Sequence, residues 1–218
     1  MLTNPKRAIW EALLLAGLVF FLGFLLGFVW ESYQTCRMND YYMQSELYLL
    51  DSIALNSVVD IRGFDCESLY NSYSVFADRV YQEAILLQKY EDAEKITEEM
   101  KIVHRRYDLL RTFLWANILK NSNSCKEKSN TLVYLYEYNT ENLAKKATQN
   151  VWSKVLFDLK QTERNNILLI PIASDLDIIS LGILTERFNI SEYPVVIINN
   201  EEVIYDLTSI EDLKKHLN

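Results

Sequence analysis

Residues Leu181 to Ile198, with the sequence LGILTERFNISEYPVVII, decide how the second half of the chain folds. The first part belongs to a helix predicted over residues 177–188, and the last part is a strand predicted over residues 194–198. Pro194 is the first residue of that strand, a position at which a proline is tolerated in a sheet. A helix that leads into a β-branched, apolar strand is the kind of unit from which α/β folds are built.

The segments on either side of this stretch alternate between strand and helix patterns. β-branched and aromatic residues mark strands, a near-continuous apolar run marks a strand covered on both faces, and apolar residues at a spacing of four mark helices. The predicted strands are residues 131–138, 166–173, 194–198 and 202–205, and the predicted helices are residues 141–160, residues 177–188 and a last helix that Ser209 caps together with Asp212. The predicted order is β-α-β-α-β-β-α, and the fold class is α/β.

This order resembles the thioredoxin fold, and Phe188, Ile190 and Pro194 match a short motif of that family. There, a helix ends in an aromatic residue, followed two places on by Ile or Val and some residues later by the proline that opens the third strand. The resemblance covers about residues 130–218, and it implies a thioredoxin-like domain over residues 125–218 and a cis Tyr193–Pro194 bond. It also implies that the backbone of Tyr193 pairs with an extended peptide as an added strand would. The alternative is that Pro194 serves only the turn.

The same resemblance implies that the domain has no thiol chemistry. Oxidoreductases of this fold carry Cys-x-x-Cys at the start of the helix after the first strand, where the helix N-terminus stabilises a thiolate. In this chain the region is Asn139 to Lys146, NTENLAKK, which contains no cysteine. If Gln149 matches a glutamine that follows the second cysteine in some relatives, Leu143 and Lys146 hold the two thiol positions.

The N-terminal segment Ala12 to Trp30 contains no charged residue and is predicted to cross a membrane. As a helix it is about 28 Å long, close to the hydrocarbon thickness of a bilayer. Lys6 and Arg7 precede it and Glu31 follows it, which places the N-terminus in the cytoplasm and residues 31–218 outside. A cleaved signal peptide is the alternative, but it would have a shorter apolar core and a site of small residues.

Gly23 and Gly27 form one GxxxG spacing within this segment, and such a spacing lets two membrane helices approach closely. They mark the face through which a homodimer would form.

Residues 31–124 are predicted to form an extracytoplasmic helical stalk and hairpin, after a cytoplasmic tip and anchor over residues 1–30. Residues 31–61 contain neither Gly nor Pro, so the anchor helix can continue outward. Gly63 and Asp65 then end it and cap the next helix. The segments 66–90 and 93–119 have apolar residues at spacings of three and four, which predicts an α-hairpin.

The chain contains three cysteines, Cys36, Cys66 and Cys125. Outside the cell membrane disulfides persist. Since Cys66 opens the first hairpin helix and Cys125 follows the second, the two sulfurs are predicted to meet at the same end of the hairpin and to form a disulfide. Cys36 would then be a buried thiol or a bridge between two subunits.

Composition excludes several function classes. The chain has 22 basic and 30 acidic residues and a net charge of −8, and it has no dense basic patch of the kind that binds nucleic acid or anionic lipid. His104 and His216 are far apart and lack neighbours at metal-ligand spacing, so neither a metal nor another cofactor is expected. Asp175 and Asp177 are predicted to cap a helix rather than to bind Ca²⁺.

Asn189 begins the triplet Asn-Ile-Ser, an acceptor for N-glycosylation on the predicted outer side.

Two function hypotheses follow. The preferred one is a membrane-anchored protein whose redox-inactive thioredoxin-like domain binds an unidentified protein or peptide partner, as a scaffold or a folding assistant. The alternative is a thiol-disulfide oxidoreductase that uses Cys66 and Cys125 as its exchangeable pair.

Overall fold

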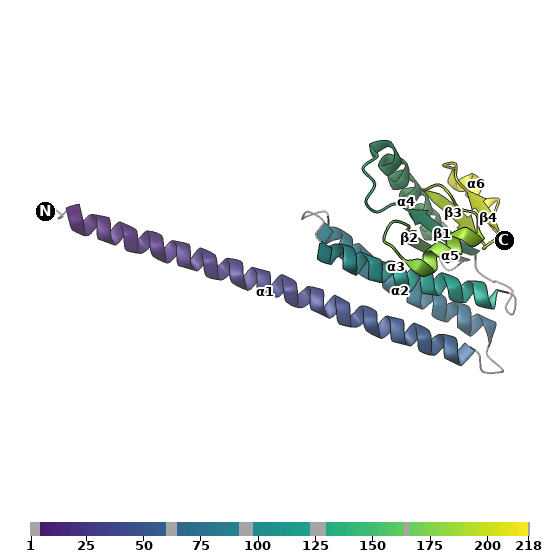
Figure 1. Cartoon of the computed structure of the whole chain (residues 1–218), viewed down its shortest axis with the longest axis horizontal. Helices are drawn as coiled ribbons and strands as arrows, with labels where there is room; N and C mark the ends of the chain where they lie inside the picture. The colour runs from purple at the N-terminus through teal and green to yellow at the C-terminus, as the bar shows by residue number, and fades with distance from the viewer. Residues whose placement is uncertain (1–4, 60–64, 92–97, 123–129, 164–165, 218) are drawn as a thin grey trace. The chain divides into compact units, whose positions relative to one another are not determined.

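The computed structural model describes residues 5–59, 65–91, 98–122, 130–163 and 166–217. Its elements are α1 (Pro5–Val59), α2 (Cys66–Glu91), α3 (Glu98–Asn121), β1 (Asn130–Tyr136), α4 (Leu143–Glu163), β2 (Ile167–Ala173), α5 (Ile179–Arg187), β3 (Val195–Ile198), β4 (Glu202–Ile204) and α6 (Ile210–Lys214) (Figure 1). The predicted α/β class and the order of the last seven elements are confirmed. Two compact units make up the chain, one ending at Gln44 and one beginning at Ser45.

The first unit consists of the N-terminal part of α1. Within it, Ile9–Val29 is 21 residues long, is apolar enough to cross a membrane, and has none of its side chains buried. The structure thus contains one helix near the N-terminus with the length and composition of a membrane span, overlapping the predicted Ala12–Trp30. A Cβ added at Gly23 or Gly27 would meet no atom within 4 Å, and dimerisation through these glycines stays a prediction.

The second unit is built on a four-stranded mixed sheet in the order β2-β1-β3-β4. β1 pairs with β2 in parallel and with β3 in antiparallel orientation, and β3 pairs with β4 in antiparallel orientation. β1 and β3 are therefore interior strands, and β2 is an edge strand. Asn199 and Asn200 connect β3 to β4 with φ of 50° and 59°. Asparagine is one of the few residues that adopt this left-handed conformation readily.

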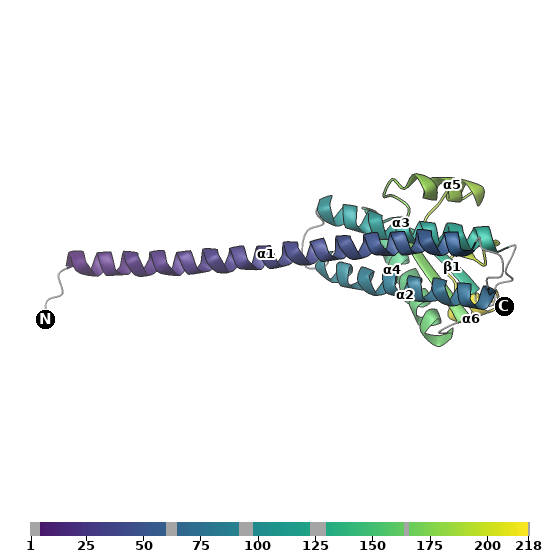
Figure 2. The same ribbon diagram turned by 90° about the horizontal axis from the view of Figure 1, so that it is seen from below.

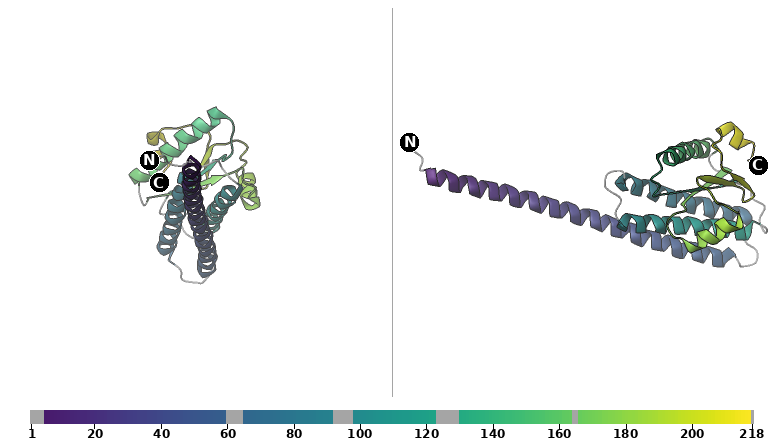
Figure 3. Two further views of the ribbon diagram at one scale, coloured as in Figure 1. Left: turned by 90° about the vertical axis from the view of Figure 1, so that its left-hand side faces the viewer. Right: turned by 45° about the horizontal axis from the view of Figure 1, so that its top comes forward.

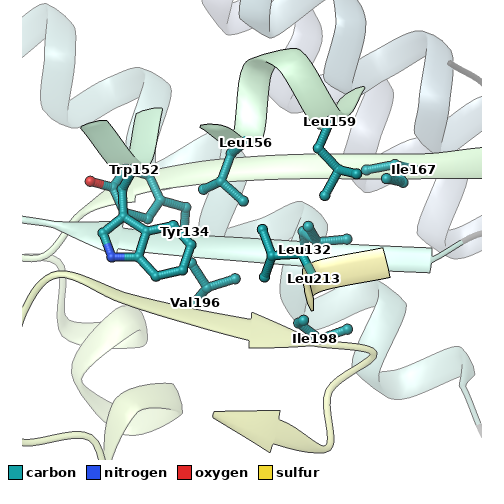
Figure 4. Close-up of a cluster of buried hydrophobic side chains, with 9 residues drawn as sticks. All are labelled: Leu132, Tyr134, Trp152, Leu156, Leu159, Ile167, Val196, Ile198 and Leu213. Carbon is teal, nitrogen blue, oxygen red and sulfur yellow. The ribbon is translucent and has the colours of Figure 1, made fainter. Parts of the chain in front are cut away.

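One face of the sheet is covered by α4 and α6. Successive side chains of a strand point to opposite faces, and alternate residues of β1 and β3 face this cover. The resulting apolar cluster consists of Leu132, Tyr134, Trp152, Leu156, Leu159, Ile167, Val196, Ile198 and Leu213 (Figure 4). The other alternate residues of β1 and β3, such as Val133 and Val195, are equally buried on the opposite face.

That opposite face is covered by α3, with α5 beside it (Figures 1 and 3). Trp115 of α3 is fully buried, its Nε1 donates to Oδ1 of Asn200 at 2.9 Å, and its ring stacks on Phe188 with centroids 5.4 Å apart. Arg105 Nη2 donates to the carbonyl of Asp177 at 2.6 Å. α3 is thus attached to the turn between β3 and β4 and to both ends of α5.

α2 lies beside α3, and together they form the predicted hairpin (Figure 2). Nδ2 of Asn121, at the end of α3, donates to the Tyr73 hydroxyl at 3.0 Å, and Tyr48 of α1 contacts Phe76 edge to face. Because α3 also covers the sheet, the hairpin and the sheet belong to the same compact unit.

Two predicted helix caps are confirmed. Oδ2 of Asp65 accepts a hydrogen bond from the Ser68 backbone N–H at the start of α2. The Ser209 hydroxyl accepts a hydrogen bond from the Asp212 N–H at the start of α6. Each cap satisfies an N–H that has no partner within the helix.

The predicted capping of α5 by Asp175 and Asp177 is wrong. The N-cap of α5 is Ile178, which makes no side-chain cap. The Asp175 carboxylate instead accepts hydrogen bonds from the backbone N–H groups of Tyr138 and Asn139, each at 2.7 Å. It holds the loop between β1 and α4, because two charge-assisted bonds to a distant loop outcompete a local cap.

Candidate binding cleft

A cleft of about 520 Å³ is lined by residues of α2, α3, β1, β2 and α4. Its volume lies within the usual range for ligand sites. A second cavity, of about 260 Å³, shares Tyr81, Phe157 and Leu169 with it. Leu169 and Pro171 come from the edge strand β2, so the cleft opens where the sheet ends. We call it the β2 cleft.

The polar wall of the β2 cleft comes from α3. His104, Asp108 and Arg111 follow one another at spacings of four and three, so that they share one side of the helix. Asp108 is completely buried. Its Oδ1 accepts a hydrogen bond from Arg111 Nη1 at 2.8 Å, and its Oδ2 lies 3.3 Å from His104 Nε2.

Burial raises the pKa of Asp108, while the charges of His104 and Arg111 act in the opposite direction. A carboxylate that is buried away from water is stabilised only by charged or hydrogen-bonding partners. Asp108 therefore fixes the positions of the two cleft-lining side chains, His104 and Arg111, from behind.

The aromatic wall comes from β1 and the residues after it. His104 Nε2 lies 3.0 Å from the Tyr136 hydroxyl, and the imidazole packs against Tyr138 with centroids 4.1 Å apart. Tyr134 stacks on Tyr136 at 5.5 Å. Across the cleft, Tyr81 of α2 stacks on Phe157 of α4 at 6.4 Å. The space between is suited to a flat or apolar group.

Arg111 is the most deeply buried of the charged side chains that line the cleft. Only 6% of it is exposed, yet it lines the cleft. A guanidinium has five N–H donors. Within the described part of the chain, Asp108 is its one hydrogen-bond partner, through Nη1. The other donors are left for an occupant of the cleft.

The end of β1 is held in place at the rim of the cleft by Gln149. Its amide accepts from the Glu137 N–H and donates to the Glu137 carbonyl, both at 2.9 Å. The Glu137 carboxylate is paired with Lys145 Nζ at 2.7 Å. Lys146 is exposed at the same rim and makes no ion pair with the residues that the structure describes.

The residues predicted to form a peptide groove lie elsewhere. The Tyr193–Pro194 bond is cis, as predicted, and both residues are half-buried directly before β3. Neither lines the β2 cleft. Leu143 is the first residue of α4 and is 81% exposed, and Lys146 is the only one of the two predicted thiol positions that reaches the cleft. Asn189 is exposed at the end of α5.

Cys66 is disulfide-bonded. Its predicted partner Cys125 lies outside the described residues, as does the side chain of Cys36, so the pairing of Cys66 with Cys125 stays a prediction. Among the residues that the structure describes, no group of three or more His, Cys, Asp or Glu side chains could hold a metal ion.

The contacts of His104 with Asp108 and Tyr136 were not predicted from the sequence. The available signal was local: His104, Asp108 and Arg111 interrupt the apolar side of a helix at helical spacing. No family model matches this sequence, and no curated protein is significantly similar to it.

Proposed function

We propose that this chain is a single-pass membrane protein whose C-terminal part is a thioredoxin-like domain that binds a protein or peptide partner outside the cell membrane, without thiol chemistry. The proposal is supported by the apolar helix Ile9–Val29 and by the order β1-α4-β2-α5-β3-β4-α6, on which the resemblance rests. Lys6 and Arg7 before the apolar segment support the orientation.

One observation carries the functional part. α4 follows β1 and begins at Leu143, the place where an oxidoreductase of this fold presents its attacking thiol. Leu143 is 81% exposed, and neither it nor Lys146 can exchange a disulfide. A domain without a thiol at this position can bind a partner, but it cannot perform disulfide exchange there.

A photocrosslinking experiment tests the binding role. The full chain is produced in membranes with a photoreactive phenylalanine analogue in place of Tyr193, and with the same analogue in place of Tyr205, a surface tyrosine after β4, as the matched control. We expect a crosslinked product of discrete mass from position 193 and none from position 205. Equal products from both positions, or none from either, would contradict the proposal.

The alternative is an oxidoreductase that uses Cys66, which is disulfide-bonded, and Cys125 as its exchangeable pair. Insulin reduction by the full chain in detergent micelles decides between the two. We expect no turnover above that of a Cys66→Ser variant. Turnover that disappears in the variant would establish the oxidoreductase instead.

A further inference from the structure

We propose that the β2 cleft is a binding site for an organic carboxylate with a flat or apolar body, and that Arg111 is the residue that binds the carboxylate. This proposal does not depend on the thioredoxin-like assignment or on a peptide partner at Tyr193. It rests on the residues of α2, α3, β1 and α4 that line the cleft.

The state of Arg111 is the first argument. Removing a guanidinium from water is costly unless its donors are paired. Only 6% of Arg111 is exposed, and its Nη1 donates a hydrogen bond to Asp108. Within the described residues the remaining donors have no protein partner, and they belong to a side chain that lines a cavity of about 520 Å³. The planar donors of arginine match the two oxygens of a carboxylate.

The charge around Arg111 selects an anion. Asp108 balances one positive charge from behind, and Glu137 is balanced by Lys145 at 2.7 Å. Lys146 adds a positive charge at the rim, without a partner among the described residues. The lining therefore has one uncompensated positive charge, which suits a singly charged carboxylate better than a doubly charged phosphate.

The rest of the lining selects the body of the ligand. His104 and the Tyr136 hydroxyl, which lie 3.0 Å apart and contact each other, add two polar groups to the lining. The other walls are aromatic rings and aliphatic side chains: Tyr81, Tyr138, Phe157, Leu156, Leu169 and Pro171. Such walls bury an apolar or aromatic body, and a few placed polar groups fix its orientation.

The test uses the full chain in detergent micelles with sodium benzoate as the probe. The two histidines of the sequence give an internal comparison, because His104 lines the cleft while His216 contacts Glu202 at 2.7 Å elsewhere. With ¹³C-labelled histidine, benzoate should shift the ring-proton signals of His104 and leave those of His216 unchanged. The titration should saturate with a dissociation constant of about 1 mM or lower.

Two further probes define the ligand class. Benzamide has the shape of benzoate but no charge, and inorganic phosphate is charged but has no aromatic or apolar group. We expect each to bind at least about ten-fold more weakly than benzoate. Binding of benzamide as tight as that of benzoate would show that Arg111 plays no part, and equal binding of phosphate would show a general anion site. Either result overturns the proposal.

Variants then assign the residue. Arg111→Lys keeps the positive charge beside Asp108 but loses the planar donors, and it should weaken benzoate binding about ten-fold. Tyr136→Phe removes one hydroxyl and should weaken binding about three-fold. Tyr205→Phe, the matched control outside the cleft, should bind as the parent does. If Arg111→Lys and Tyr136→Phe both keep the parent affinity while their circular dichroism is unchanged, the proposal is wrong.

Discussion

α4 and α3 cover opposite faces of the same sheet, yet they do so with different side chains. α4 buries Trp152, Leu156 and Leu159, with Gln149 as its one buried polar residue in the described chain. α3 buries an apolar stripe as well, and in addition the polar residues Asp108, Arg111, Thr112, Asn117 and Asn121. A helix that only fills a core has no need of these groups, since burying each requires a partner. These polar groups serve different contacts, because Asn121 bonds Tyr73 of α2, whereas Asp108 bonds Arg111 at the β2 cleft.

The largest test of this comparison removes the buried carboxylate of α3. Asp108→Ala leaves Arg111 buried without its partner, and the free energy of unfolding should fall by about 3–5 kcal/mol. The double variant Asp108→Leu with Arg111→Met should lose less, because no uncompensated charge remains. Urea unfolding of the full chain in micelles measures both. A double variant as unstable as the single one would show that packing, and not the charge pair, matters here.

The two buried tryptophans compare the helices directly. Trp115 of α3 donates to Asn200, whereas Nε1 of Trp152 in α4 is buried without a hydrogen-bond partner among the described residues. Replacement by Phe removes the same atoms from both. Trp115→Phe also loses a hydrogen bond, whereas Trp152→Phe removes an unsatisfied donor. The free energy of unfolding of Trp115→Phe should therefore be lower than that of Trp152→Phe by about 2 kcal/mol. Equal losses in urea unfolding would contradict this.

The titration of Asp108 gives a smaller and pH-dependent effect. Because burial raises its pKa in the folded protein, the folded state binds more protons than the unfolded state above about pH 4. Stability from this group is therefore greatest below its unfolded pKa, and it falls as pH rises toward the folded pKa. Between pH 4 and 6, the slope of the free energy of unfolding against pH should be more negative in the His104→Gln variant than in the double variant His104→Gln with Asp108→Asn. The difference in slope should be at most about 1.4 kcal/mol per pH unit.

The smallest expected effect is that of an exposed ion pair on the same helix. Glu98 accepts a hydrogen bond from Lys101 at 2.7 Å, but its side chain is 80% exposed. Glu98→Gln should change the free energy of unfolding by less than about 0.5 kcal/mol, since water screens such pairs. A loss comparable to that of Asp108→Ala would remove the distinction between buried and exposed charge on α3.

The sequence predicts most of the secondary structure, because strands, helices and caps depend on neighbouring residues. The caps at Asp65 and at Ser209 are local patterns of this kind. The apolar stripe of α3 is also read correctly from its spacing, and Tyr107, Leu110 and Leu114 are all buried.

The β2 cleft could not be predicted in the same way. It depends on contacts between residues far apart in the chain, such as His104 with Tyr136 and Arg105 with Asp177. Asp175 shows the limit most clearly. Its position before a helix favours a cap, but its carboxylate binds a loop 36 residues earlier. Spacing along the chain indicates that these polar groups share a side of α3. Which residues they contact depends on how the sheet packs against that side.

The turn between β3 and β4 is joined by side-chain hydrogen bonds to two other parts of the chain, the start of β1 and α3. Oδ1 of Asn199 accepts from the Thr131 N–H, its Nδ2 donates to Asn130, and Asn200 accepts from Trp115. Glycine would suit the turn backbone equally well, but it would supply none of these bonds. A shortened protein that began after α3 would lose the Trp115 bond and the helix that covers this face of the sheet together with α5. The smallest fragment able to fold as the parent does must therefore include α3.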